Sequence, residues 1–246
     1  MNKNVETLFI FAGGLGTRFS EKTKKIPKPL VLLNGKPLIH HIIDHYIEYG
    51  YKKIIILSGY KSSKFDKYFK KVSLKRNKNI YTMKNNVEVH NLFTGIDSLT
   101  STRLYKGLKY IDDEYFSITY GDGISNVDLN SLREFHFDNK SFLTITAVRP
   151  PSRFGEIIFE NDNIKQFNEK KSINVGWING GYFMTSRAIM KYLKPINESF
   201  EKEPISRIIK NEKVFGFKHE GFWRPVDTIR ELEIVSKEIR TMNEEK

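Results

Sequence analysis

The chain has 246 residues, a formal net charge of +12 at pH 7 and no cysteine. That length suits one large α/β domain with a buried core, or two small ones, and the missing cysteines exclude disulfides and thiolate catalysis. No apolar run approaches the roughly 20 residues that span a bilayer, and the N-terminus lacks a signal-peptide pattern, so we expect a cytoplasmic protein without membrane contacts. The charge could serve nucleic acid, but the lysines are scattered and no RNA-binding motif occurs, which favours a small anionic partner.

The first predicted element is a buried strand over residues 7–12 that runs directly into the loop GGLGTR, residues 13–18. Glycines let a ligand approach the backbone, whose N–H groups can then bind phosphate oxygens. Arg18 adds a forked cation that suits phosphate. Lys28 follows within Pro-Lys-Pro, where both prolines stiffen the chain. A glycine turn alone is common, but its pairing with this lysine predicts a phosphate site.

Helices and strands then alternate along the chain. A helix is predicted over residues 36–49, a buried strand over 54–57 and a helix over 63–71. This rhythm predicts a parallel, doubly wound sheet whose ligands bind at the carboxyl ends of its strands. The GGLGTR loop and Gly59 both fall at such ends.

The next segments add short strands at residues 80–82 and 87–89, and a helix that ends near Tyr110. A strand over residues 115–120 is closed by Gly-Asp-Gly. A carboxylate at that position, Asp122, is well placed to hold Mg²⁺ against phosphates, although an Asp-Gly pair by itself is usually only a turn.

The second half of the chain begins with a helix from Asp128, its expected N-cap, to Phe137. We then predict the following elements: a strand over 142–148, a hairpin of strands 156–159 and 164–167, helical structure over 188–211 broken near Pro195 and Pro204, and a last helix that starts after Asp227.

Four segments together resemble one enzyme family. They are GGLGTR with PKP, TYGDG at 119–123, WINGG at 177–181 and GFWRPVDT at 221–228. Over about residues 7–235 the chain resembles the sugar-1-phosphate nucleotidylyltransferases, and within them it looks most like the glucose-1-phosphate cytidylyltransferases. The resemblance implies an α/β fold with a doubly wound, mostly parallel but mixed sheet, Rossmann-like and GT-A-like, with small β-hairpin additions. It also implies a single domain over 1–246, with a nucleotide-binding half at 1–140 and a sugar-phosphate-binding half at 141–235.

The resemblance also assigns roles to individual residues. Arg18 and Lys28 would act in catalysis by steadying the phosphates, and Asp122 and Asp227 would hold Mg²⁺. Nucleotide contacts would come from Ala12, Gly13, Gly14, Gly16, Thr17, Arg18, Lys28, Gly59, Thr100, Arg103 and Gly121. Sugar-phosphate contacts would come from Glu169, Lys170, Asn179, Gly180 and Trp223.

The implied reaction joins CTP and α-glucose 1-phosphate to give CDP-glucose and pyrophosphate, in a homo-oligomeric enzyme. The sugar phosphate is already an anion, so the site must supply positioning and charge neutralisation rather than a base. Three alternatives stay open: another sugar 1-phosphate or nucleoside triphosphate, a glycosyltransferase that uses Asp122 for a metal, and an inactive nucleotide-binding protein of the same fold.

Overall fold

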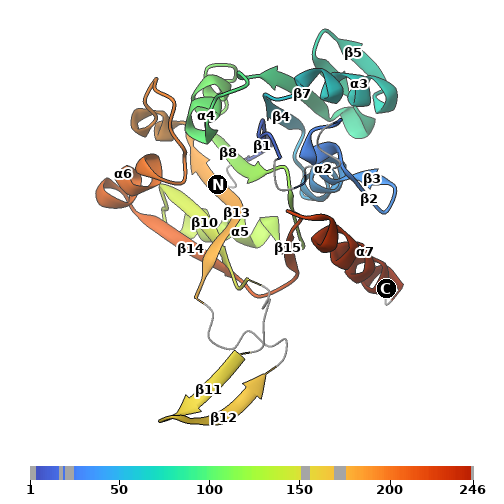
Figure 1. Ribbon diagram of the computed structural model, residues 1–246. Helices are drawn as coiled ribbons and strands as arrows, with labels where there is room; N and C mark the ends of the chain where they lie inside the picture. Colours follow the sequence, from blue (N-terminus) through green and yellow to red (C-terminus); the bar gives the residue numbers. More distant parts are fainter. Residues whose placement is uncertain (1–3, 17–18, 20–24, 151–155, 169–175, 245–246) are drawn as a thin grey trace.

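The computed structural model describes residues 4–16, 19, 25–150, 156–168 and 176–244. Nine strands of this part of the chain form one sheet, shown in Figure 1. In spatial order they are β14 (Val214–His219), β10 (Leu143–Val148), β13 (Ile178–Ser186), β8 (Tyr115–Tyr120), β1 (Thr7–Ala12), β4 (Lys53–Ser58), β7 (Glu88–Phe93), β6 (Ile80–Thr82) and β5 (Lys75–Asn77).

The four central strands, β8, β1, β4 and β7, run parallel to one another. Antiparallel strands follow on both sides, because β13 pairs with β8 and β6 pairs with β7 in the opposite direction. The predicted doubly wound, mixed α/β sheet is therefore confirmed. The carboxyl ends of the four central strands meet at one edge, where ligands bind in such sheets.

Strand β1 shows why these apolar runs form the centre of the sheet. Leu8 and Ile10 point into a core on one face, whereas Phe9 and Phe11 point into a second core on the other face. All four are buried. Alternate residues of a strand face opposite sides, so a strand that is covered twice must be apolar throughout.

Helices cover both faces of the sheet (Figure 1). Buried side chains of α2, α3, α5 and α7 belong to the first core, and those of α4, η4 and α6 to the second; the bounds are α2 (Leu38–Glu48), α3 (Ser62–Val72), α4 (Thr100–Leu108), α5 (Leu129–Asp138), η4 (Arg187–Tyr192), α6 (Glu203–Asn211) and α7 (Ile229–Glu244). The single turns are η2 (Lys28–Leu30) and η3 (Lys84–Asn86). None of the described helices combines the length and apolar character needed to cross a bilayer.

Three small two-stranded sheets complete the described chain: β2 (Leu32–Leu33) with β3 (Lys36–Pro37), β9 (Gly123–Ser125) with β15 (Trp223–Pro225), and β11 (Glu156–Glu160) with β12 (Asn163–Asn168). The last pair confirms the predicted hairpin. Asp128 also caps α5 as predicted, because its side chain accepts hydrogen bonds of 2.9 Å from the N–H groups of Asn130 and Ser131.

Some predicted boundaries were wrong. The helix expected from Lys36 begins at Leu38, because Lys36 and Pro37 pair with β2. The helical structure expected over 188–211 is interrupted over 193–202, and Pro204 lies in the first turn of α6, which suits a residue without an N–H. Strand β14 was not predicted at all. It lies at the edge of the sheet, is only partly buried and contains Gly216, and glycine weakens the strand signal.

Candidate active site

A hollow of about 200 Å³ lies at the carboxyl edge of the central strands. It is lined by the loop after β1, the Pro-Lys-Pro segment, the end of β8 and the start of α7: Phe11, Ala12, Gly14, Gly16, Phe19, Lys28, Pro29, Gly121, Asp122 and Asp227. Seven of the residues assigned from the sequence thus surround one space, namely Ala12, Gly14, Gly16, Lys28, Gly121, Asp122 and Asp227.

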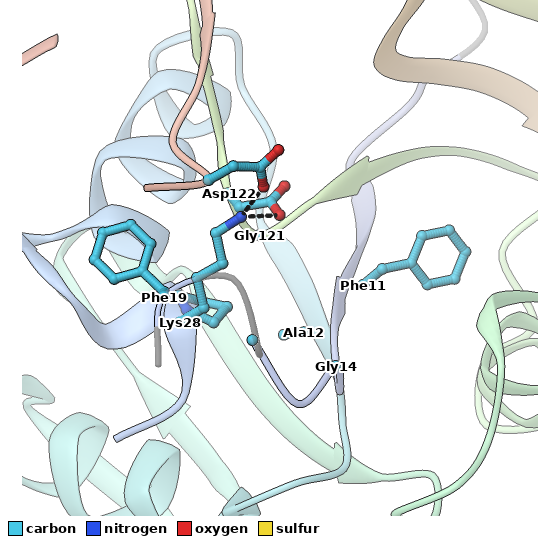
Figure 2. A pocket seen from close by; sticks show the side chains of 10 residues that line it. Phe11, Ala12, Gly14, Phe19, Lys28, Gly121 and Asp122 are labelled. Atoms are coloured by element: carbon cyan, nitrogen blue, oxygen red, sulfur yellow. Dashed lines mark hydrogen bonds and ion pairs between the residues drawn. The ribbon is translucent and has the colours of Figure 1, made fainter. Parts of the chain in front are cut away.

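The centre of this hollow is a lysine between two carboxylates. The Lys28 ammonium lies 2.7 Å from Oδ2 of Asp122 and 2.5 Å from Oδ1 of Asp227. Figure 2 shows the lysine side chain reaching up to both acidic groups. Only 11% of the lysine side chain is exposed. Three residues far apart in the sequence therefore form one compact ionic cluster.

The packing of the Pro-Lys-Pro segment against the end of β8 brings Lys28 close to the two carboxylates. It begins the turn η2 and is followed by Pro29, which packs against Gly121 so closely that a Cβ on this glycine would lie 2.8 Å from Cγ of the proline. The Gly121 N–H also donates a 3.0 Å hydrogen bond to the Phe11 carbonyl oxygen. Gly121 thus lets the Pro-Lys-Pro segment approach β8 directly.

Asp227 lies just before α7, where an acidic side chain is often only a helix cap. Here Thr228 and Glu231 make hydrogen bonds at the start of α7. The Thr228 hydroxyl accepts a hydrogen bond from the Glu231 N–H, and the Glu231 carboxylate accepts one of 2.8 Å from the Asp227 N–H. The Val226 N–H donates to the Asp122 carbonyl oxygen at 3.0 Å, which brings the two aspartates together.

The charges in the cluster support one another. Burial by itself would lower the pKa of Lys28, but the Asp122 carboxylate and then the Asp227 carboxylate outweigh it, so the pKa is raised. The ammonium therefore stays charged at neutral pH. Two carboxylates that converge on one cation are a donor set that suits Mg²⁺, which takes few protein ligands and completes its shell with phosphate and water oxygens. No group of three or more His, Cys, Asp or Glu residues in the described ranges surrounds a metal position.

Arg103 packs against the backbone of the glycine loop after β1. It is 3% exposed and sits on α4. Its guanidinium donates to the Gly13 carbonyl at 3.0 Å and to the Ser58 carbonyl at 2.9 Å. It also donates to the Thr94 hydroxyl and to the carbonyls of Gly95 and Ile96. Burial lowers its pKa to about 10.

Two of the glycines assigned to nucleotide binding make room for this arginine. A Cβ on Gly13 would lie 2.0 Å from Cζ of Arg103, and a Cβ on Gly59 would lie 2.5 Å from its Nη1. Gly14, by contrast, has no atom within 4 Å of such a Cβ. Gly14 therefore has free space beside its backbone, whereas Gly13 packs against the Arg103 guanidinium.

Three described residues that were assigned to sugar-phosphate binding, Asn179, Gly180 and Trp223, lie on β13 and β15. Asn179 is exposed and precedes Gly180, and the register between β10 and β13 shifts at this point. Bulges of this kind often re-aim a side chain next to a site. The indole N–H of Trp223 donates a 2.7 Å hydrogen bond to the Gly180 carbonyl oxygen, and Trp223 itself is only 9% exposed. This contact ties β15 to the bulge.

Four assigned residues, Thr17, Arg18, Glu169 and Lys170, lie outside the described residues. Thr100 begins α4 and contacts Glu201 rather than the hollow. The sequence reasoning gave no role to Tyr120 and Glu201, which are joined by a 2.6 Å hydrogen bond between the two predicted substrate regions. The signal in the sequence was the place of Tyr120 inside TYGDG and of Glu201 three residues before Pro204.

Comparison with known proteins agrees with this geometry. The family model described as "Nucleotidyl transferase" matches residues 8–241. The chain belongs to the nucleotidyl transferase family. It is 37% identical over 239 residues to the probable glucose-1-phosphate cytidylyltransferase of Bacillus subtilis strain 168, which covers 93% of this chain and 94% of that protein. It is 36% identical over 234 residues to the glucose-1-phosphate cytidylyltransferase of Salmonella typhi, which covers 90% and 91%.

The fold agrees as well. The crystal structure of HddC from Yersinia pseudotuberculosis superposes with a TM-score of 0.71 at 23% identity, covering 96% of this chain and all of that one. Membership of the nucleotidyl transferase family confirms that this chain is an enzyme of the sugar-1-phosphate nucleotidylyltransferase class that its motifs predicted.

Proposed function

We propose that this nucleotidyltransferase transfers the cytidylyl group of CTP to glucose 1-phosphate, giving CDP-glucose and pyrophosphate. The observation that carries the proposal is identity of 36–37% over nine tenths of the chain to proteins with that printed activity. The convergence of Lys28, Asp122 and Asp227 at the carboxyl edge of the sheet supports it.

In this proposal the two halves of the chain bind different substrates. Residues 1–140 bind the nucleotide through the loop after β1, and residues 141–235 bind the sugar phosphate. Gly14 and Gly16 line the hollow and offer backbone N–H groups to the triphosphate. Asn179 donates and accepts hydrogen bonds with sugar hydroxyls, which an amide side chain can do at once.

The bond that forms joins a phosphate oxygen of glucose 1-phosphate to the α-phosphorus of CTP, and the bond that breaks links the α-phosphorus to the bridging oxygen of pyrophosphate. The attacking oxygen is already anionic at neutral pH, so no side chain has to take a proton. The chain must hold the two phosphates in line and offset their charge. Lys28 supplies one such positive charge from a rigid segment.

Asp122 and Asp227 would hold Mg²⁺, and the metal when bound would polarise the α-phosphoryl group. Their carboxylates already converge on a cation, that of Lys28. The predicted Arg18 and the Lys28 ammonium would then contact the triphosphate and the departing pyrophosphate. A homo-oligomer, which the resemblance implies, remains a prediction.

The test is pyrophosphate release with Mg²⁺ across CTP, UTP, GTP, dTTP and ATP, each against a panel of sugar 1-phosphates. We expect release with CTP and glucose 1-phosphate, and a loss of at least about 100-fold in Asp122→Asn. The exposed Asp138, at the end of α5, provides the matched control Asp138→Asn. Use of CTP with another sugar would reassign the substrate, and no release with any pair would refute the enzymatic proposal.

A further inference from the structure

We propose that Tyr120 and Glu201 are positioning residues that orient the Asn179 side chain for the sugar phosphate. The inference rests on the proposed function, because it takes Asn179 as a sugar contact. Neither Tyr120 nor Glu201 lines the hollow around Lys28. Together with Thr100 and Asn179 they form a separate series of hydrogen bonds, the relay, which links the start of α4 to β13.

The chain of hydrogen bonds is continuous. The Thr100 hydroxyl donates to Oε2 of Glu201 at 2.7 Å, and the Tyr120 hydroxyl donates to Oε1 of the same carboxylate at 2.6 Å. Nδ2 of Asn179 then donates to the Tyr120 hydroxyl oxygen at 3.4 Å. At the far end, the Gly181 N–H donates to Oδ1 of Asn179 at 2.8 Å.

Donor and acceptor rules fix the direction of every bond. An ionised carboxylate only accepts, so the Tyr120 proton must point at Glu201. The phenol oxygen is then left as an acceptor, so the NH₂ group of the Asn179 amide must face it. The backbone N–H of Gly181 independently requires that the amide oxygen of Asn179 face it. Two separate constraints therefore select one of the two possible orientations of the amide.

The phenol that transmits this constraint is held firmly. The Tyr120 ring lies 5.7 Å from the ring of Phe11 and 5.9 Å from that of Phe183. Gly181 packs against it with a φ of +80°, and a Cβ there would lie 2.5 Å from Cδ2 of Tyr120. Burial and then the Glu201 carboxylate raise the pKa of Tyr120, so the phenol keeps its proton at neutral pH.

The position of the relay connects it to the reaction. Tyr120 is two residues before Asp122 on the same strand end, so an amide held by Tyr120 is fixed relative to the ionic cluster. One N–H and one lone pair of the exposed Asn179 amide are not used by Tyr120 and Gly181. Those two groups have a set orientation for a sugar hydroxyl, which saves the entropy of ordering them on binding.

The experiment compares Tyr120→Phe with the wild type. The substitution removes one oxygen, keeps the ring packing and takes away the acceptor of Asn179. We expect KM for the sugar 1-phosphate to rise about five- to tenfold, as for the loss of one hydrogen bond, while KM for the nucleotide changes by less than about twofold. Tyr110→Phe is the control, because its hydroxyl bonds His90 beyond the other end of α4.

A double-mutant cycle separates positioning from a general structural effect. In an Asn179→Ala background, Tyr120→Phe should have no further effect on KM, because the group it orients is gone. Glu201→Ala should raise KM as Tyr120→Phe does, and Glu201→Gln should rescue most of the loss, because an amide oxygen can still accept from the phenol. Additive effects, or an unchanged KM in Tyr120→Phe, would overturn the proposal.

A measurement without substrate keeps this test independent of the proposed function. The side-chain amide of Asn179, assigned by its loss in Asn179→Ala, should give sharp ¹H–¹⁵N NMR signals that shift or broaden in Tyr120→Phe but not in Tyr110→Phe. Unchanged signals would mean that Tyr120 does not hold the amide. If the signals move but no sugar phosphate is used, the relay stands as a contact and only the proposed function fails.

Discussion

The guanidinium of Arg103 donates a 3.0 Å hydrogen bond to the carbonyl oxygen of Gly13, which joins helix α4 to the loop after β1. The same guanidinium reaches the Ser58 carbonyl at the end of β4 and the Gly95 carbonyl after β7. Among the described residues its bonds go to backbone carbonyls and one hydroxyl. One side chain thus holds the ends of three neighbouring parallel strands.

Replacing this arginine should therefore destabilise the fold and loosen the nucleotide loop. Arg103→Lys keeps a charge but cannot reach all the buried carbonyls, each of which costs about 1–3 kcal/mol when left unpaired. We expect the free energy of unfolding, measured with urea, to fall by at least about 3 kcal/mol and nucleotide affinity to fall with it. The exposed Arg230 gives the control Arg230→Lys, which should change stability by less than about 0.5 kcal/mol. Equal effects of the two substitutions would contradict the assignment.

Gly181 and Gly35 offer a matched pair for testing the packing against Tyr120. Their φ angles are +80° and +82°, so alanine strains both backbones alike, by about 1 kcal/mol. A Cβ on Gly35 meets no atom within 4 Å, whereas one on Gly181 would meet the Tyr120 ring at 2.5 Å. Gly181→Ala should therefore lower the free energy of unfolding by about 1–3 kcal/mol more than Gly35→Ala. Chemical denaturation measures the free energy of unfolding of each variant. Equal losses would mean that the Tyr120 ring moves aside at no cost in free energy.

The histidines of α2 should make stability depend on pH. Burial, with the nearby charges of Lys36 and His41, lowers the pKa of His40 from 6.5 to about 4, and the Asp44 carboxylate, 3.5 Å from Nε2 of His40, also pairs with Lys36. Between these values the unfolded chain binds a proton that the folded chain does not. Stability is therefore fully present above about pH 6.5 and falls as the pH drops toward 4.

For this partly exposed ring we expect a loss on the order of 1–2 kcal/mol. His40→Gln should remove that part of the slope in urea titrations between pH 7 and 4.5. A variant with the wild-type slope would show that His40 is not the responsible group.

Lys28 should compete with a metal at Asp122 and Asp227. The Lys28 ammonium bonds both carboxylates, so a divalent cation that binds them must displace it. Lys28→Met should raise the affinity for Mn²⁺, followed by the paramagnetic resonance of the free ion, by about tenfold, yet lower the rate of pyrophosphate release. Asp227→Asn in the same background should abolish the gain. Weaker Mn²⁺ binding in Lys28→Met would contradict the competition.

The central strands and the residues around Lys28 could be predicted from the sequence because their signals are local. Continuous apolar runs that end in glycine, such as residues 7–13, predict both the strand and its loop. Asp122 follows a predicted strand, so its place at the carboxyl edge could be predicted from topology, whereas the place of Asp227 beside it was expected only from the family resemblance.

The roles of Arg103 and Tyr120 could not be predicted in the same way. A sequence shows that an arginine follows Thr94 and Gly95 but not which carbonyls it bonds, since these come from Gly13 and Ser58 far away in the chain. The relay through Glu201 depends likewise on a contact across about 80 residues of sequence. Such hydrogen bonds follow from tertiary packing, which propensity and periodicity do not encode.

The room that Gly13 and Gly59 leave for Arg103 has an evolutionary consequence. A side chain at either glycine collides with the guanidinium, and loss of the guanidinium leaves a void lined by unpaired carbonyls. Each single change is therefore harmful while the other two positions stay as they are. We expect the three residues to be inherited as one unit, so that lineages of this enzyme diverge in the surrounding loops and keep or exchange this trio together.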